Sequence, residues 1–445
     1  MNNGEILSRR KVGQADGATA DLTYEGRSCR PNGALSFLQK PLDTRGWIVS
    51  ALLILSGVIW HRPDLVLTPQ FFGDESLWFG DAYMHGAWQS LLKPQAGYLC
   101  LASKLPNLIA VCLPVIFAPT VGCFFAITAQ VLMLLYLLSD RLEAVAPLRF
   151  RAVLCFFWLA LPNCFEVLTL NNTQWILAAG GALVLLSSPP ASTLWQVIDI
   201  VVIALMGLTG PYCFLLLPIG GVLWFVRRKQ WTAILTFIIG CTCLIQAYVL
   251  AHWHTVCVPV RVLSGNAVRL LAIQVFSLGM LAMNGTIRSA VIANRAACIL
   301  IVCAGLIIVL VALIRAPLEF KLFVAFGCMV TAAAAFRLHC DPHWSWEGML
   351  SHEASADRYW YIPRLAFISS IVWLAFDSRW STTMRSAARV ALLLTAIVAL
   401  ISWRHPAPPD FHWPQYAERL ESSPAGTTVW IPVNPPGWKF YLQKH

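Results

Sequence analysis

The sequence predicts an all-α polytopic membrane protein, with about 11 transmembrane helices and with interfacial helices in its outer loops. Hydrophobic residues make up 58% of the 445 residues and charged residues only 12%, and the mean hydropathy is +0.65. Soluble domains contain roughly 25% charged residues. Long apolar runs without the alternation of a β-barrel recur along the chain, and in lipid such runs must form helices.

The first 45 residues are polar and basic and contain no long apolar run. We expect residues 1–45 to be a disordered cytoplasmic tail. They do not form a secretory signal, because the first apolar run starts only near Gly46 and no small-residue cleavage site accompanies it.

A transmembrane domain is expected over residues 46–403, followed by a short outer (periplasmic) tail, residues 404–445, that is rich in Pro and Trp. The expected spans cover approximately residues 46–60, 119–138, 152–165, 174–188, 193–209, 211–226, 231–250, 296–314, 319–336, 363–377 and 388–403.

Short basic connectors separate these spans and fall on one side of the membrane when this count is used. They lie at residues 141–151, 227–229, 315–321 and 379–389. Because positively charged loops stay in the cytoplasm, this side is the predicted cytoplasmic side. The N-terminus is then inside and the C-terminus outside, in what we expect to be a bacterial inner (plasma) membrane. The net charge of +10 is dispersed over connectors, so we expect no nucleic-acid partner.

Residues 102–118 are apolar, but a transmembrane span here would place every later loop on the opposite side of the membrane. We expect this segment to lie in the outer interface, interrupted by Pro106 and Pro114.

The first outer loop contains a pair of carboxylates, Asp74 and Glu75, next to a membrane surface. Carboxylates are costly to desolvate there, so the pair is a functional hypothesis. If the segment is helical as far as Gln89, one face combines acidic and aromatic residues and suits a sugar: Asp74, Leu77, Trp78, Asp81, His85 and Trp88. Alternatively, the acids only complement a helix dipole and the aromatic residues anchor headgroups.

A second outer element is rich in amides. Glu166, Asn171, Asn172 and Trp175 lie between two apolar spans. So many polar groups at membrane depth need partners, which suggests a hydrated pocket wall. Helix capping and interhelical hydrogen bonds are the alternative.

The third outer element, residues 251–295, is rich in arginine and suits anionic headgroups. Its His252 and His254 have no nearby carboxylate, so no metal site is expected. Most of the 14 cysteines lie in apolar runs as small hydrophobic residues. A bridge between Cys257 and Cys340 stays open.

The fourth element precedes the tenth span and contains Arg358 and Tyr359. The planar donor fork of an arginine suits a phosphate. Two alternatives remain, a local pair of Arg358 with Asp357 and snorkelling of Arg364.

Together these elements resemble the GT-C class of integral membrane glycosyltransferases. The resemblance covers most of the chain after Arg45. It rests on the acidic pair in a long first outer loop, on Lys93-Pro94-Gln95-Ala96-Gly97-Tyr98, on the amide-rich turn from Asn171 to Trp175, and on Arg358-Tyr359.

The resemblance implies transfer of a sugar, hexosyl or pentosyl, from a polyprenyl-phosphate donor to an envelope glycan or glycolipid acceptor at the outer face, with inversion. Asp74, or alternatively Glu75, would be the base, and Arg358 would hold the donor phosphate. The substrate-binding positions that it implies are Asp81, His85, Lys93, Tyr98, Glu166, Asn171, Asn172, Trp175, Arg358 and Tyr359. No cofactor and no divalent metal are expected.

Two departures concern the acceptor. Many relatives have a His-Pro-Pro type sequence where this chain has Lys93-Pro94-Gln95, and the large soluble domain of some branches is absent. Both argue against a protein oligosaccharyltransferase.

The alternatives are a transporter or flippase for a lipid-linked or amphipathic anion, and a related glycan ligase or polymerase. A transporter should show inverted repeats and charged groups at the bilayer centre. No internal repeat is evident, and Asp199, near one end of the fifth span, has no evident intramembrane basic partner. The sequence leaves the sugar, the acceptor, the lipid length and the oligomeric state open.

Overall fold

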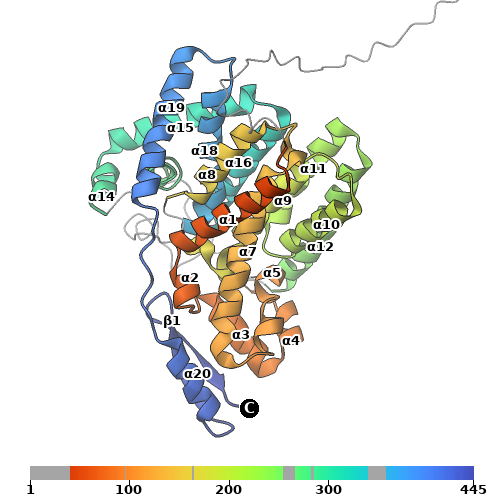
Figure 1. Cartoon of the computed structure of the whole chain (residues 1–445), viewed down its shortest axis with the longest axis vertical. Coiled ribbons are helices and arrows are strands. Elements are labelled where there is room, and N and C mark those ends of the chain that lie inside the picture. Colours follow the sequence, from red (N-terminus) through yellow and green to blue (C-terminus); the bar gives the residue numbers. More distant parts are fainter. Residues whose placement is uncertain (1–40, 96, 163–164, 254–265, 282–284, 339–356) are drawn as a thin grey trace, which may run out of the picture.

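The computed structural model describes residues 41–95, 97–162, 165–253, 266–281, 285–338 and 357–445, and these residues are mostly helical (Figure 1). Most of the expected N-terminal tail lies outside the described residues. Cys257, Cys340 and His254 also lie outside them. The bridge between the two cysteines therefore stays open, and the expectation that His252 and His254 form no metal site stays a prediction.

Each segment that was expected to span the membrane contains a helix. These are α1 (Thr44–His61), α7 (Ala118–Leu138), α8 (Leu148–Leu159), α9 (Thr173–Leu186), α10 (Thr193–Gly207), α11 (Tyr212–Arg227), α12 (Gln230–His252), α15 (Arg295–Arg315), α16 (Leu318–Leu338), α18 (Tyr361–Phe376) and α19 (Thr382–Ile401).

Seven helical stretches within the described residues are long and apolar enough to cross a membrane; they contain α1, α7, α12, α15, α16, α18 and α19. Helices α8 to α11 have 12, 14, 15 and 16 residues, fewer than the roughly 20 that a straight span needs. The chain is therefore a helical membrane protein, and the predicted count of eleven spans is not confirmed.

The other elements are short. They are α2 (Asp64–Leu67), α3 (Asp74–His85), α4 (Ala87–Leu92), α5 (Leu101–Lys104), α6 (Asn107–Ala110), η2 (Val115–Phe117), η3 (Asp140–Leu142), η4 (Phe165–Leu168), η5 (Leu170–Asn172), α13 (Asn266–Leu270), the π-helix η6 (Leu271–Ser277), α14 (Gly285–Ala293), η7 (Asp357–Trp360) and α20 (Trp413–Ser422). The segment 102–118 is indeed interrupted, because α5, α6 and η2 replace a continuous helix.

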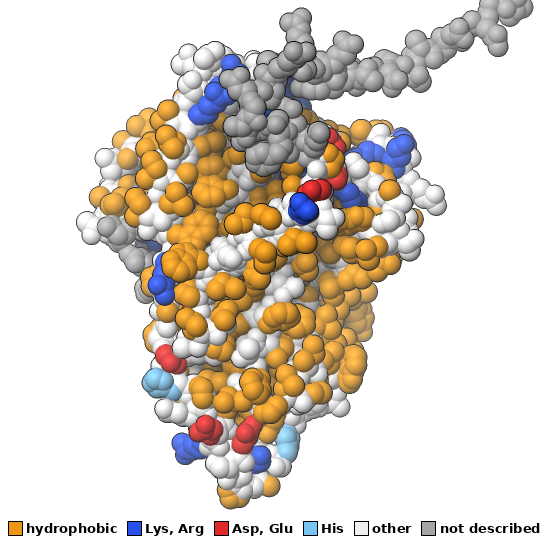
Figure 2. Space-filling model, viewed as in Figure 1, with side chains coloured by type: hydrophobic (Ala, Val, Ile, Leu, Met, Phe, Trp, Pro, Cys, Tyr) orange, Lys and Arg blue, Asp and Glu red, His pale blue; other side chains and the backbone are white. Residues whose placement is uncertain are grey.

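The basic connectors meet at one end of the helix bundle. Arg227 donates to Glu319 at 3.0 Å, and Arg379 donates to the carbonyl oxygen of Arg315 at 3.1 Å. Phe150 packs edge-on against Phe376. Figure 2 shows Lys and Arg side chains near this end, above a mainly hydrophobic surface. The predicted grouping of the connectors is confirmed, and its assignment to the cytoplasm stays a prediction.

The C-terminal residues form a folded unit at the other end of the molecule (Figure 1). Strands β1 (Thr428–Val433) and β2 (Trp438–Gln443) pair antiparallel, and α20 packs against β1. Their buried side chains form a second apolar core with α3, which includes Phe79, Leu420, Ile431, Phe440 and Leu442. The amide of Gly73 donates to the carbonyl oxygen of Asn434 at 2.6 Å. The tail thus supports the start of α3.

Helices α10 and α12 approach closely at Gly207. A Cβ atom at this position would lie 2.6 Å from the Cβ atom of Thr242, whereas at Gly221 nothing lies within 4 Å. We expect Gly207→Ala to lower the free energy of unfolding by about 1–3 kcal/mol, because the two helices must move apart. Chemical denaturation in detergent micelles measures this effect, with Gly221→Ala as the control. Equal effects of the two substitutions would contradict this packing.

Candidate functional site

Asp74 is the first residue of α3 and is partly exposed. Burial raises the pKa of its carboxyl group, whereas the positive charges of Arg358 and Lys104 oppose this shift. Residues from three distant parts of the sequence are therefore close enough to influence one another electrostatically. Asp74 and Arg358 lie in the same polar cluster, which we call the outer cluster and which comprises Asp74, Lys104, Glu166 and Arg358.

Arg358, in η7, forms an ion pair with Glu166, in η4. Its Nη1 atom lies 3.2 Å from Oε2 of Glu166. Only 8% of Glu166 is exposed, and burial raises the pKa of its carboxyl group to about 7, against the opposing charge of Arg358. The alternative of a local pair between Arg358 and Asp357 is wrong, because the partner of Arg358 comes from a different part of the chain.

Asp357 binds Arg364 instead, at 3.0 Å. Arg364 is fully buried and also donates to the carbonyl oxygen of Gln274 at 2.6 Å and to its Oε1 atom at 2.8 Å. The snorkelling interpretation of Arg364 is therefore wrong. These bonds join η7 to the π-helix η6 and to α18, and so they fix the backbone that carries Arg358.

Aromatic rings adjoin Arg358. Its guanidinium lies 5.1 Å from the ring centroid of Tyr359. Trp175 packs edge-on against Tyr359, with a centroid separation of 5.3 Å, and against Tyr212, at 5.1 Å. Tyr98 is close enough to influence Tyr212 electrostatically. The structure thus brings Tyr98, Trp175 and Tyr359 together near Arg358.

Glu75 faces a different environment from Asp74. It is buried, and its carboxylate accepts the amide protons of Phe72 at 3.1 Å and of Asn171 at 2.9 Å. It also lines a cavity of about 20 Å³, large enough for about one water molecule. The lining of this cavity includes Arg62 and Asn434 but neither Asp74 nor Arg358. Glu75 therefore joins α3 to the turn at Asn171.

The buried carboxyl group of Glu75 predicts a pH dependence of stability. Burial raises its pKa from 4.5 to about 7, although three backbone amides and Arg62 oppose the shift. A raised folded-state pKa means that the folded protein binds the proton more tightly. The resulting stabilisation is complete below about pH 4.5 and is lost as the pH rises through about 7. The size of this contribution is about 3 kcal/mol.

We therefore expect Glu75→Gln to remove this contribution to the pH dependence, while the similar contribution of Glu166 remains. Denaturation curves of both proteins between pH 5 and 8 would measure it. Parallel pH dependences of the wild type and the variant would contradict the assignment.

The two asparagines of the amide-rich turn have structural contacts. The side chain of Asn172 is fully buried and donates to the carbonyl oxygen of Glu166 at 2.7 Å and to Thr169 at 3.0 Å. Asn171 contributes its backbone amide to Glu75. Asn172 is the N-cap residue of α9, but its side chain makes no capping hydrogen bond to that helix. Its bonds instead hold η5 against η4, which carries Glu166.

Asp81, His85 and Lys93 form a separate, more exposed group. Lys93 lies 2.7 Å from Asp81 and His85 lies 3.2 Å from it. The predicted continuous face from Asp74 to Trp88 is wrong, because α3 ends at Gly86, whose φ of +99° favours glycine. Trp88 belongs to α4 and points to the surface.

The sequence reasoning missed Lys104, which lies between these two groups. Its side chain is buried, and its Nζ atom donates to the carbonyl oxygens of Ser90 at 3.1 Å and of Lys93 at 2.7 Å. Burial lowers the pKa of Lys104, and the charges of Asp81 and Asp74 raise it. The sequence contains one signal that could have pointed to Lys104, because it is the single lysine in the otherwise apolar segment 102–118. A charge next to a membrane needs partners.

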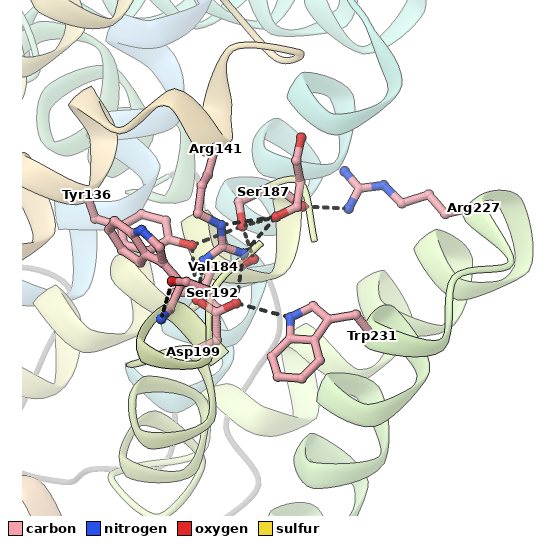
Figure 3. A network of polar contacts seen from close by, with 10 residues as sticks. Tyr136, Arg141, Val184, Ser187, Ser192, Asp199, Arg227 and Trp231 are labelled. Atoms are coloured by element: carbon pink, nitrogen blue, oxygen red, sulfur yellow. Dashed lines mark hydrogen bonds and ion pairs between the residues drawn. The ribbon is translucent and has the colours of Figure 1, made fainter. Parts of the chain in front are cut away.

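Asp199 has the basic partner that the sequence did not reveal. Figure 3 shows its carboxylate facing Arg141 and Trp231, which lie 2.7 and 3.1 Å away. Tyr136 donates to it as well, at 3.3 Å. The basic partner of Asp199 comes from the connector between α7 and α8 and not from another span. The pair lies among the basic connectors, at the end of the bundle remote from Asp74.

Comparisons with the models of known protein families and with the curated proteins find no match to this chain. Within the described residues there is no group of three or more His, Cys, Asp and Glu side chains that could hold a metal ion. The expectation of a reaction without cofactor or divalent metal stays a prediction.

Proposed function

We propose that this protein is a membrane glycosyltransferase that moves a sugar from a polyprenyl-phosphate donor to an envelope glycan or glycolipid. The observation that supports this proposal best is the outer cluster. It combines the carboxylate of Asp74 with two cations, Arg358 and Lys104. The carboxylate of Asp74 forms no hydrogen bond or ion pair with another described side chain. A base and a cation next to membrane-spanning helices are the groups that such a transfer requires.

Asp74 is the proposed base. Its carboxylate accepts the proton of an acceptor hydroxyl group while that oxygen attacks the anomeric carbon of the donor. The bond from the anomeric carbon to the phosphate oxygen breaks, and polyprenyl phosphate leaves with the bonding electrons. One displacement inverts the anomeric configuration. Glu75 is the poorer candidate, since both of its carboxylate oxygens already accept backbone amides.

Arg358 is the proposed ligand of the donor phosphate. Its present partner, Glu166, must give way when the phosphate binds. Since the pKa of Glu166 is raised to about 7, Glu166 can take up a proton near neutral pH and release the guanidinium. The partly exposed rings of Tyr98 and Tyr359 offer apolar faces on which a sugar can stack, and the buried ring of Trp175 packs edge-on against Tyr359.

Reconstitution into liposomes tests the proposal. Purified protein would be supplied with polyprenyl-phosphate sugars and with a glycolipid acceptor, and the products would be identified by mass spectrometry and NMR. We expect free polyprenyl phosphate together with a new glycoside of inverted configuration. The same assay in excess EDTA tests the prediction that no divalent metal is needed. Passage of the intact donor across the bilayer, without a new covalent product, would contradict the proposal and favour a transporter.

A further inference from the structure

A groove between α8 and α19 lies at the end of the bundle that contains the basic connectors. It has a volume of about 430 Å³. Its lining consists of Arg149, Ala152, Val153, Phe156 and Phe157 from α8 and of Arg389, Leu392, Leu393 and Ala396 from α19. Apart from the two arginines, every lining residue is apolar.

The two helices line this groove in the same way. In each helix an arginine, Arg149 at the start of α8 and Arg389 in the first half of α19, is followed by apolar residues three, four and seven positions later, which is the spacing of one helical face. Both helices begin at the end of the connectors. Each stripe extends over about 10 Å at a rise of 1.5 Å per residue. The groove therefore has a cationic mouth and an apolar interior.

Neither arginine at the mouth forms an ion pair with an acidic side chain in the described part of the chain. Arg149 is exposed, and Arg389 donates to the carbonyl oxygen of Ala375 at 3.2 Å. On the loop before α19, Asp377 binds Arg379. On the connector before α8, Asp140 and Glu143 act electrostatically on Arg151, and neither forms an ion pair with Arg149 in the described part of the chain. The N-terminal end of α8 adds positive potential at Arg149, the second residue of that helix, whereas Arg389 lies about two turns inside α19.

We propose that this groove binds an acidic phospholipid, with one acyl chain along the two apolar stripes and the phosphate between Arg149 and Arg389. The two arginines and the apolar lining of the groove together select this occupant. A zwitterionic lipid would fill the apolar part equally well but would gain less from the two arginines, since each basic side chain near a membrane surface favours an anionic lipid. The site is remote from Asp74 and does not depend on the proposed transfer reaction.

Native mass spectrometry of the whole protein in detergent micelles tests this site. Phosphatidylglycerol and phosphatidylcholine with identical acyl chains would be titrated into the wild type, into the double variant Arg149→Gln/Arg389→Gln, and into Arg228→Gln, which removes an exposed arginine from another connector. We expect the wild type and Arg228→Gln to prefer phosphatidylglycerol. The double variant should lose roughly thirtyfold of this preference, at about 1 kcal/mol for each arginine.

A second variant tests the apolar part. Ala396→Phe should weaken the binding of both lipids by filling the groove, and its melting temperature without added lipid reports whether the variant is folded. Equal affinity of the wild type for the two lipids would overturn the proposal. Unchanged preference in the double variant would overturn it too, as would tight binding of glycerol phosphate without acyl chains.

Discussion

Replacing Asp199 with asparagine is expected to lower the free energy of unfolding by about 3–5 kcal/mol. Asp199 is fully buried and Arg141 is 9% exposed, so the substitution leaves a guanidinium in the protein interior without its counter-charge. The asparagine side chain has nearly the same shape, which separates loss of charge from loss of packing. Chemical denaturation in detergent micelles is the measurement.

A pair of the same residue types whose arginine is exposed provides the control for Asp199. The closest distance between Asp377 and Arg379 is 2.6 Å, and the side chain of Asp377 is 8% exposed, but that of Arg379 is 57% exposed. We expect Asp377→Asn to change stability by no more than about 1 kcal/mol. The double variant Asp199→Leu/Arg141→Met should be less damaging than Asp199→Asn, because no unpaired charge remains buried. Similar losses for Asp199→Asn and Asp377→Asn would show that the buried pair contributes little.

The helical framework was predictable because membrane insertion leaves little choice of backbone structure. An apolar run in lipid has to satisfy its amides internally, so every expected span contains a helix. Helices α8 to α11 turned out shorter than full spans, since polar turns such as η4 and η5 occupy part of the apolar region between them. Hydropathy does not indicate where a helix stops within an apolar run. The C-terminal hairpin was missed because its strands are short and lie in a Pro-rich segment.

The sequence predicted which segments contribute to the candidate site. It did not predict which residues contact one another there. Asp74, Glu166 and Arg358 come from three of the four outer elements, and they are close enough to form an ion pair or to influence one another electrostatically. The partners of the arginines were not predicted. Arg358 binds Glu166, 192 positions away, and not Asp357, and Arg364 is not at the surface but binds Gln274, 90 positions away. Distant partners depend on how helices pack, and a single sequence carries no record of that packing.

Asp74 and Glu75 have different environments, although they are adjacent in the sequence. Adjacent residues on a helix point about 100° apart, so one carboxylate can face the outer cluster while the next faces the interior. Glu75 is engaged by two backbone amides, and Asp74 by none that the structure describes. Asp74 is therefore the candidate for a functional role, and Glu75 has a structural role.

Substitution of Asp74 by asparagine is expected to reduce kcat/KM of sugar transfer by about 10²- to 10⁴-fold, the contribution typical of a general base. The amide cannot accept the proton of the acceptor hydroxyl. Because Asp74 makes no hydrogen bond that supports the fold, the stability of the variant should stay within about 0.5 kcal/mol of the wild type. The transfer assay in liposomes and denaturation in micelles measure the two quantities separately.

Glu75→Gln is the matched comparison, and it should show the opposite pattern. One of its two acceptor oxygens becomes an NH₂ group, so its stability changes, while transfer persists because Asp74 remains. In the wild type, activity should rise with pH as Asp74 loses its proton, and burial places this rise above the usual range of an aspartate. Full turnover by Asp74→Asn, together with loss of turnover in a folded Glu75→Gln, would transfer the role of base to Glu75. Full turnover in both variants would remove the carboxylate pair from the mechanism, and would leave the outer cluster as a purely structural contact between α3, η4 and η7.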